Sequence, residues 1–403
     1  MPNSASASIP SITKGLPSKD AGLKLTVYLM DNTPLNLAVC QDVKAEAVLT
    51  SCLRRVGLLE SSIRILHNCF SLSESLDCGE TISSPLSAYD YVLDSVASWR
   101  VREKSPGSAR MFMGLRLVTS GVLGACHSDP ALAHMLFITC CHDVMRGVLK
   151  QTADSAVLLA GLMLFIRLGP YDPARVFYLP NLYEGTIPDS LLPLRAPEVW
   201  NGLIASSYAR LGDLGGGENK VQLAKELYCN TLEESELFGN HIFKATQTFS
   251  RILPSPLLLG ISAEGILFLN VDLQPLQLIA LQNIELWTGM CDGGLGEEGT
   301  KGKPVSNLSN IKGFFQITLK PSPSATTSLF SFSSSAGGQL YNFSCSEGGT
   351  AASLLRAFTE QLLREIVEEE KDAPSLSVPT PQLDAVLVVG AGGKGGVGGA
   401  GSP

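Results

Sequence analysis

Residues 257–269 read LLLGISAEGILFL, and this stretch predicts a β-hairpin. Two apolar runs flank the segment Ser262-Ala-Glu-Gly265, whose glycine suits a tight turn. Further strand-like runs follow at 276–281, 284–287, 314–319, 329–332 and 340–345, with a glycine-rich loop before the third of them. The last apolar pattern has helical spacing and puts six residues on one face: Ala351, Leu354, Leu355, Phe358, Leu362 and Ile366. Seven antiparallel strands closed by one helix predict a PH/PTB-type sandwich.

Upstream of this segment the periodicity is helical. Asp129-Pro130 has the form of a helix start, with aspartate as the cap and proline at the first helical position. Residues 153–168 are apolar on nearly every side, as in the central helix of a bundle. Helical patterns at 200–211 and 220–232 complete an all-α domain of four predicted helices.

The first part of the chain alternates apolar and polar residues. Residues 23–29 and 35–39 are separated by a turn sequence and predict two paired strands. Asp42 is expected to cap a helix that ends before Gly57. A third strand is expected at Ile63–Leu66 and another helix at Ala88–Trp99. This order predicts a small ubiquitin-like roll.

The overall composition and net charge narrow the possible functions. The chain has 403 residues, of which 45% are hydrophobic and 17% charged, with a net charge of −8. The acidic balance disfavours nucleic-acid binding, which needs clustered lysine and arginine. No secretory signal is recognisable, and the longest apolar run, Ala156–Ile166, is too short to span a bilayer. We expect a cytoplasmic protein in five segments: a disordered tail (1–20), the roll (21–105), the helical domain (106–244), the sandwich (245–370) and a disordered Gly/Pro-rich tail (371–403).

The order of roll, helical bundle and sandwich resembles the three lobes of a FERM domain. Local stretches share the resemblance: residues 88–99 (AYDYVLDSVASW), Asp129-Pro-Ala-Leu132 with Phe137 and Asp143-Val-Met-Arg-Gly147, and Asn283-Ile-Glu-Leu-Trp287. The third lobe is most similar to those of talin and of the FERM tails of unconventional myosins. The resemblance covers residues 21–370 and implies an α+β cloverleaf whose second lobe is a four-helix, acyl-CoA-binding-protein-like bundle. It also implies a non-catalytic adaptor that links membrane-protein tails or cargo to the actin cytoskeleton or a motor, at the cell cortex.

The same resemblance implies a peptide site in the third lobe. In talin-like lobes the tryptophan that matches Trp287 touches receptor-tail peptides, which add as a strand to the sheet edge beside the closing helix. We therefore expect a groove formed by Ile284, Leu286, Trp287, Leu355 and Thr359. The chain departs from talin immediately before the tryptophan, where Glu285 and Leu286 replace basic residues. An acidic peptide would be repelled by Glu285.

Two other functions stay open on the sequence. A lipid-facing set, Arg100, Arg102, Lys104 and Arg110, would favour weak binding to phosphoinositides. An enzyme would need a set of catalytic residues that is not visible here, since no GxSxG motif occurs. His134 and His142 lie two helical turns apart, too far to share a metal ion, and the ten cysteines form no CxxC pair. Gly390–Gly395 matches GxGxxG, but no helix pattern follows it. We expect no metal and no cofactor.

Overall fold

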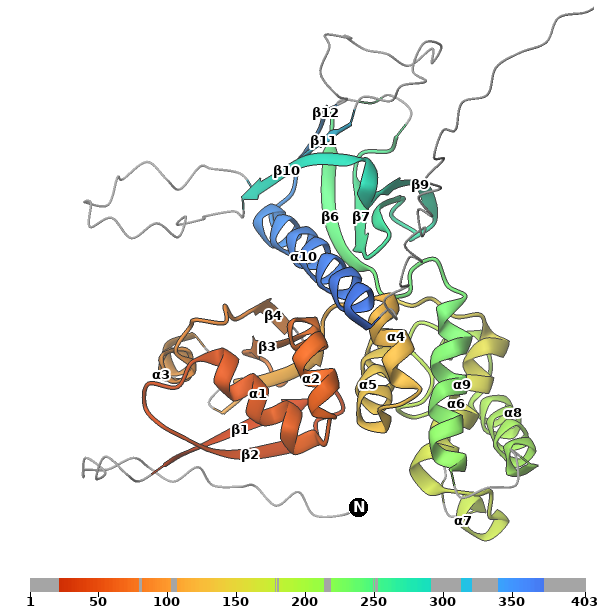
Figure 1. Ribbon diagram of the computed structural model, residues 1–403. Coiled ribbons are helices and arrows are strands. Elements are labelled where there is room, and N and C mark those ends of the chain that lie inside the picture. Colours follow the sequence, from red (N-terminus) through yellow and green to blue (C-terminus); the bar gives the residue numbers. More distant parts are fainter. Residues whose placement is uncertain are drawn as a thin grey trace, which may run out of the picture.

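The computed structural model describes residues 22–79, 82–102, 107–177, 179, 181–213, 219–248, 250, 253–290, 313–320 and 340–372. Within them the chain forms three lobes, and the long helix α10 (Gly348–Asp372) runs from the third lobe toward the junction of the other two (Figure 1). The expected N-terminal tail, the C-terminal tail from residue 373, the strand at 329–332, the GxGxxG segment and Lys104 lie outside the described residues. Residues 371 and 372, where the tail was expected to begin, are the end of α10. No helix in the described ranges combines the length and the apolarity needed to cross a membrane.

The first lobe is a mixed sheet with helices against it. Its described strands are ordered β2-β1-β5-β3-β4. Their bounds are β1 Leu23–Leu29, β2 Pro34–Val39, β3 Phe70–Ser75, β4 Ile82–Pro85 and β5 Arg110–Leu115. The predicted hairpin is confirmed, with Leu25 opposite Leu37, and β1 is parallel to β5, with Val27 opposite Met111. Because β5 is an inner strand of this sheet, the first lobe extends beyond residue 105, where the sequence analysis ended it.

The helices of this lobe correct two predictions. Helix α1 (Ala45–Val56) begins after Lys44, without a side-chain cap, so Asp42 is not its cap. Its end is as expected, because Gly57 takes the left-handed conformation at φ 94°. The segment Ile63–Leu66, expected as a strand, lies in helix α2 (Glu60–Leu66). Three apolar residues in a segment of four fit one helical turn as well as a short strand, so the pattern alone could not decide between them.

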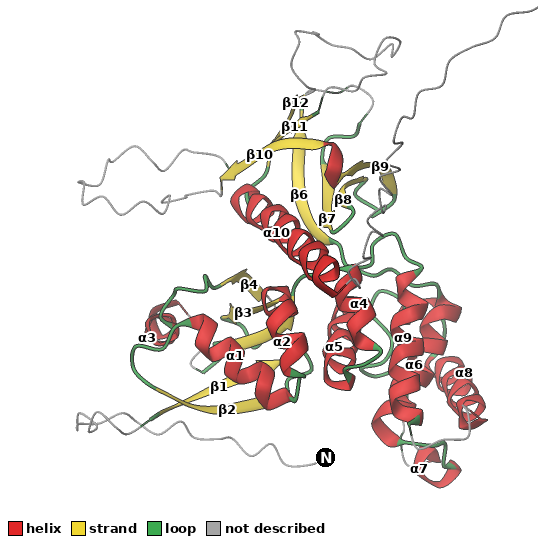
Figure 2. Cartoon of the chain, in the orientation of Figure 1, coloured by secondary structure: helices red, strands yellow, loops and turns green. Residues whose placement is uncertain are grey.

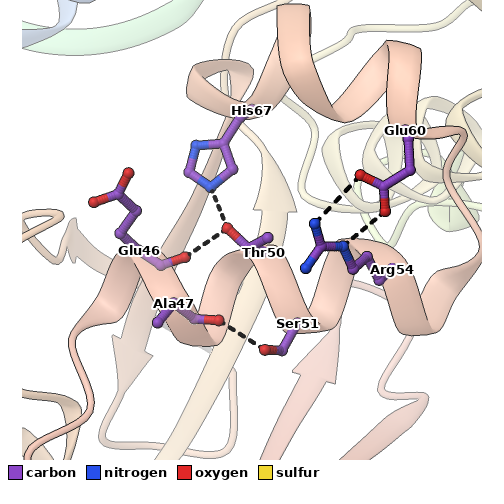
Figure 3. Close-up of polar contacts among 7 residues, drawn as sticks. All are labelled: Glu46, Ala47, Thr50, Ser51, Arg54, Glu60 and His67. Atoms are coloured by element: carbon purple, nitrogen blue, oxygen red, sulfur yellow. Dashed lines mark hydrogen bonds and ion pairs between the residues drawn. The ribbon is translucent and has the colours of Figure 1, made fainter.

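Polar contacts hold α1 and α2 together at the surface. Arg54 in α1 pairs with Glu60 at the start of α2 at 2.7 Å (Figure 3). His67, just after α2, is 3.0 Å from the hydroxyl of Thr50, and that hydroxyl donates to the carbonyl of Glu46 one turn earlier. Beneath them, Val48 and Leu53 are buried in the core of the lobe. Helix α3 (Val92–Arg102) begins four residues later than expected.

The second lobe consists of helices (Figure 2). Those described are α4 Ser120–Cys126, α5 Pro130–Met145, α6 Ala153–Leu168, α7 Pro173–Phe177, α8 Pro197–Arg210 and α9 Lys220–Glu233. The predicted start of α5 is confirmed, because Asp129 accepts hydrogen bonds from the backbone N–H groups of Ala131 and Leu132. The apolar helix α6 is central, and Gly161 lets α8 approach closely, since a Cβ there would lie 2.6 Å from Ser207 Oγ.

The third lobe is a strand sandwich closed by α10. Its seven described strands are ordered β10-β11-β12-β6-β7-β8-β9. Their bounds are β6 His241–Gln247, β7 Leu257–Ser262, β8 Gly265–Leu269, β9 Pro275–Ala280, β10 Ile284–Met290, β11 Phe314–Leu319 and β12 Leu340–Ser344. The hairpin at 257–269 forms with Ser262 opposite Gly265. Strand β6 was not predicted, and it begins before residue 245, where the sequence analysis began this lobe.

Candidate functional site

Strand β10 is an open edge of the third-lobe sheet. Among the described strands it pairs only with β11, so its other side offers backbone N–H and C=O groups for a further strand. Leu286 is 64% exposed and Met290 37%, and Glu285 and Thr288 are also exposed. An extended peptide could add here through main-chain hydrogen bonds, with these side chains beside it.

Helix α10 stands directly against this strand. The indole Nε1 of Trp287 donates a hydrogen bond to the carbonyl of Ala352, at 3.2 Å. At Gly289 a Cβ would lie 1.9 Å from the carbonyl oxygen of Gly348, so only glycine fits where the first turn of the helix meets the strand. Trp287 therefore lies half-buried across the strand–helix contact, as part of the wall of the edge.

The five residues predicted for the groove take different places. Leu286 and Trp287 lie at the open edge, one exposed and one half-buried. Ile284 is only 5% exposed and Leu355 is fully buried, so both belong to the core of the sandwich and not to its surface. Thr359 is half-buried, and its hydroxyl donates to the carbonyl of Leu355.

Two exposed residues of the edge, Thr288 and Met290, were missed by the sequence analysis. The predicted strand ended at residue 287, whereas β10 continues to Met290. Only the tertiary structure shows that this strand lies at the end of the described sheet, with exposed side chains beyond Trp287.

The basic residues considered for lipid binding are partly engaged within the first lobe. Arg102 pairs with Glu74 at 2.7 Å, and Glu74 is nearly buried. Arg110 donates to Asn32 at 3.0 Å and lies over the ring of Tyr28. Arg100 is exposed. These contacts hold two of the positive charges against the protein.

Other residues considered for chemistry lie in the helices of the second lobe and are buried or half-buried. His134 stacks on Phe137, and burial lowers the pKa of its imidazole. Burial raises the pKa of the Cys141 thiol to about 12. Cys140 is buried, and its pKa is also raised, by a hydrogen bond with Cys229 and by burial. The described residues contain no group of three His, Cys, Asp or Glu side chains placed to hold a metal ion.

Comparison with known proteins identifies the families and structures that this architecture resembles. Residues 126–243 match the FERM central domain. Over 128 residues, 32% of its length, the chain is 26% identical to unconventional myosin heavy chain 6 of Caenorhabditis elegans, of which it spans 6%.

Solved structures match most of the chain. The MyTH4-FERM MF2 domain of Dictyostelium discoideum myosin VII superposes with a TM-score of 0.58 at 14% identity, covering 84% of this chain and 58% of that one. The human myosin 7b C-terminal MyTH4-FERM domain, solved with the harmonin-a PDZ3 domain, gives 0.57 at 18% identity, covering 85% and 61%. The Drosophila Merlin FERM and C-terminal domain complex gives 0.59 at 15% identity, covering 86% and 98%.

These likenesses define the fold: the chain has an α+β, three-lobed fold like that of FERM domain structures. Its second lobe matches the FERM central domain. The chain is similar to an unconventional myosin heavy chain, of which it spans a small part, and to myosin MyTH4-FERM structures, of which it spans about three-fifths.

Proposed function

We propose that the protein is a non-catalytic adaptor that binds short peptides of membrane-receptor tails or cargo proteins at the β10 edge. Through its other surfaces it links them to the actin cytoskeleton or a motor at the cell cortex. The observation that supports this proposal best is the combination of an open strand with the adjacent helix α10. Main-chain hydrogen bonds to β10 would supply affinity, and side-chain contacts would supply specificity.

The edge also indicates the kind of peptide that fits. Leu286 and Met290 offer apolar contacts, and Glu285 brings a negative charge to the same strand. A peptide with apolar residues at alternate positions and without an acidic residue opposite Glu285 is favoured, because like charges across a strand pair repel. The myosin 7b relative was solved with a PDZ domain of harmonin, which supports protein recognition as the general activity.

The test measures the binding of labelled receptor-tail and cargo peptides to the full chain by fluorescence anisotropy. Leu286→Lys places a charge at the edge and should weaken binding about tenfold, the size expected for a central contact. Trp287→Ala should also weaken it, because the wall between strand and helix is lost.

A matched control is Leu340→Lys, in β12, an inner strand of the same sheet, where the leucine is 53% exposed and lies opposite Thr318 of β11. It should bind as the unchanged protein does. If Leu286→Lys and the unchanged protein bind the peptides with equal affinity, the β10 edge is not the peptide-binding site.

A further inference from the structure

A hollow of about 150 Å³ lies in the second lobe between α4, α5 and α9, helices that stand side by side in Figure 1. Half of its lining residues carry apolar or thiol side chains, which we call its floor: Leu123, Cys126, Ala133, Leu136, Cys229 and Phe238. A cavity of this size can hold a benzene-sized group when its lining is apolar. The hollow is therefore large enough for one leucine, methionine or phenylalanine side chain.

The thiols do not make the floor polar. Cys126 and Cys229 are each 7% exposed. Burial raises the pKa of Cys126 to about 12, so this thiol remains uncharged near neutral pH. A protonated, buried thiol behaves as a small apolar group, and the floor favours an apolar occupant.

The rim of the hollow carries net negative charge. Glu226 and Glu233 of α9 both line it, and α9 ends at Glu233, where the helix dipole is also negative. Lys225 is the one lysine or arginine among the lining residues. It is half-buried, and burial lowers its pKa. The charge of Lys225 also lowers the pKa of His134, which does not line the hollow. The positive charge of Lys225 is therefore felt outside the hollow as well as at its rim.

We propose that this hollow binds one apolar side chain, aromatic or aliphatic, of a basic segment in a partner protein. The apolar group fills the floor while neighbouring lysine or arginine residues pair with Glu226 and Glu233. This docking site is separate from the β10 edge and does not depend on it, because its lining comes from the second lobe and from Phe238, just before β6.

The chain offers a clean way to close the hollow. Gly124 lines it, and a Cβ at this position would meet no atom within 4 Å, so Gly124→Leu can place a side chain at the mouth without a clash at the backbone. Gly202 in α8 is the matched control. It is also an exposed helical glycine of the second lobe with open space at its Cβ, and it is not a lining residue.

The experiment is a titration of the methyl-labelled full chain, observed by NMR, with the probe N-acetyl-Lys-Phe-Lys-amide. Saturable shifts are expected at the methyl groups of Leu123, Ala133 and Leu136. Gly124→Leu should lower the affinity for the probe about tenfold or more, as expected when a buried anchor is excluded. Gly202→Leu should leave the affinity unchanged. Glu226→Gln combined with Glu233→Gln should weaken it by about threefold to tenfold at low salt.

Two further probes separate the contributions. N-acetyl-Lys-Ser-Lys-amide lacks the anchor, and N-acetyl-Glu-Phe-Glu-amide reverses the charge, so both should bind more weakly. The proposal is overturned if the three methyl groups do not respond, if the serine probe binds equally well, or if a folded Gly124→Leu protein binds as before. If Gly124→Leu does not fold, the probe series and the glutamate variants still test the proposal without it. Leu286→Lys, which tests the β10 edge, should leave all of these results unchanged.

Discussion

Glu365 of α10 accepts a hydrogen bond from the hydroxyl of Thr119 at 2.5 Å, although 246 residues separate the two in sequence. Its second carboxylate oxygen accepts from the N–H of Gly121 at 3.2 Å. Gln361, one turn earlier, donates to Glu365 and to the carbonyl of Ile65 in the first lobe. Glu365 is only 6% exposed, so this buried carboxylate joins the third-lobe helix to the start of the second lobe, next to the first.

Removing this carboxylate should destabilise the whole chain. Glu365→Ala leaves the buried Thr119 hydroxyl and the part-buried Gly121 N–H without their acceptor, which costs about 2–4 kcal/mol of unfolding free energy. Urea unfolding measures the loss. Glu360→Ala, at an exposed site of the same helix, is the control and should change the free energy by less than about 0.5 kcal/mol. Similar losses in both variants would show that the junction contributes nothing specific.

The glycines of α4 provide a second, independent test of the junction. At Gly121 a Cβ would lie 2.5 Å from the carboxyl carbon of Glu365, whereas at Gly124, one turn later, it would meet nothing within 4 Å. Gly121→Ala should therefore lower the melting temperature by displacing Glu365. Gly124→Ala should raise stability by up to about 1 kcal/mol, because alanine favours the helix. The opposite signs are the expected result, and equal signs would contradict it.

Asp129 serves two lobes with one side chain. One carboxylate oxygen caps α5, and the other accepts the N–H of Leu59 in the first lobe at 2.9 Å. Asp129→Ala should cost about 2–3 kcal/mol, the sum of a lost cap and a lost charged hydrogen bond. Asp154→Ala removes a surface ion pair with Arg195 and should cost less than about 1 kcal/mol. Chemical unfolding of both variants distinguishes the two cases, and a small loss at Asp129 would argue against its bridging role.

A part-buried histidine at the start of the third lobe makes stability depend on pH. The Nε2–H of His241 donates to the carbonyl of Arg116 at 2.6 Å. Burial, followed by the nearby charge of Arg116, holds the pKa of His241 below its ordinary value. At pH values between that lowered pKa and the ordinary value near 6.5, His241 is protonated in the unfolded chain but neutral in the folded chain. Stability is therefore full above about pH 6.5 and falls as the pH drops below it.

The test compares unfolding free energies at pH 5.5, 6.5 and 7.5 in the unchanged protein and in His241→Gln, which keeps a donor but does not titrate. The variant should lose less stability on acidification, by at most about 1.4 kcal/mol per pH unit for one group. His134, whose pKa is also lowered by burial, remains in both proteins and cancels in the comparison. Identical pH profiles would exclude His241 as a contributor.

The sequence by itself determined those elements whose signal is local. The hairpin at 257–269, the helix start at Asp129 and the buried helix at Ala153–Leu168 all follow from turn chemistry, capping and periodicity within one segment. The three-lobed fold was then expected because the order of these elements resembles that of a FERM domain. The strand prediction at Ile63–Leu66 was wrong, because four residues are too few to distinguish a helical period from a strand period.

The tertiary structure alone decided which residues meet. The place of β5 inside the first sheet depends on pairing with β1 and β3, which are distant in sequence. Ile284 and Leu355 looked like groove residues but are buried, because the sandwich closes over them. The contact of Trp287 with Ala352 and the junction at Glu365 are fixed by the long helix α10, which bridges lobes that no local pattern relates. Periodicity specifies which face of an element is buried, whereas the identity of the neighbour depends on how all the elements pack together.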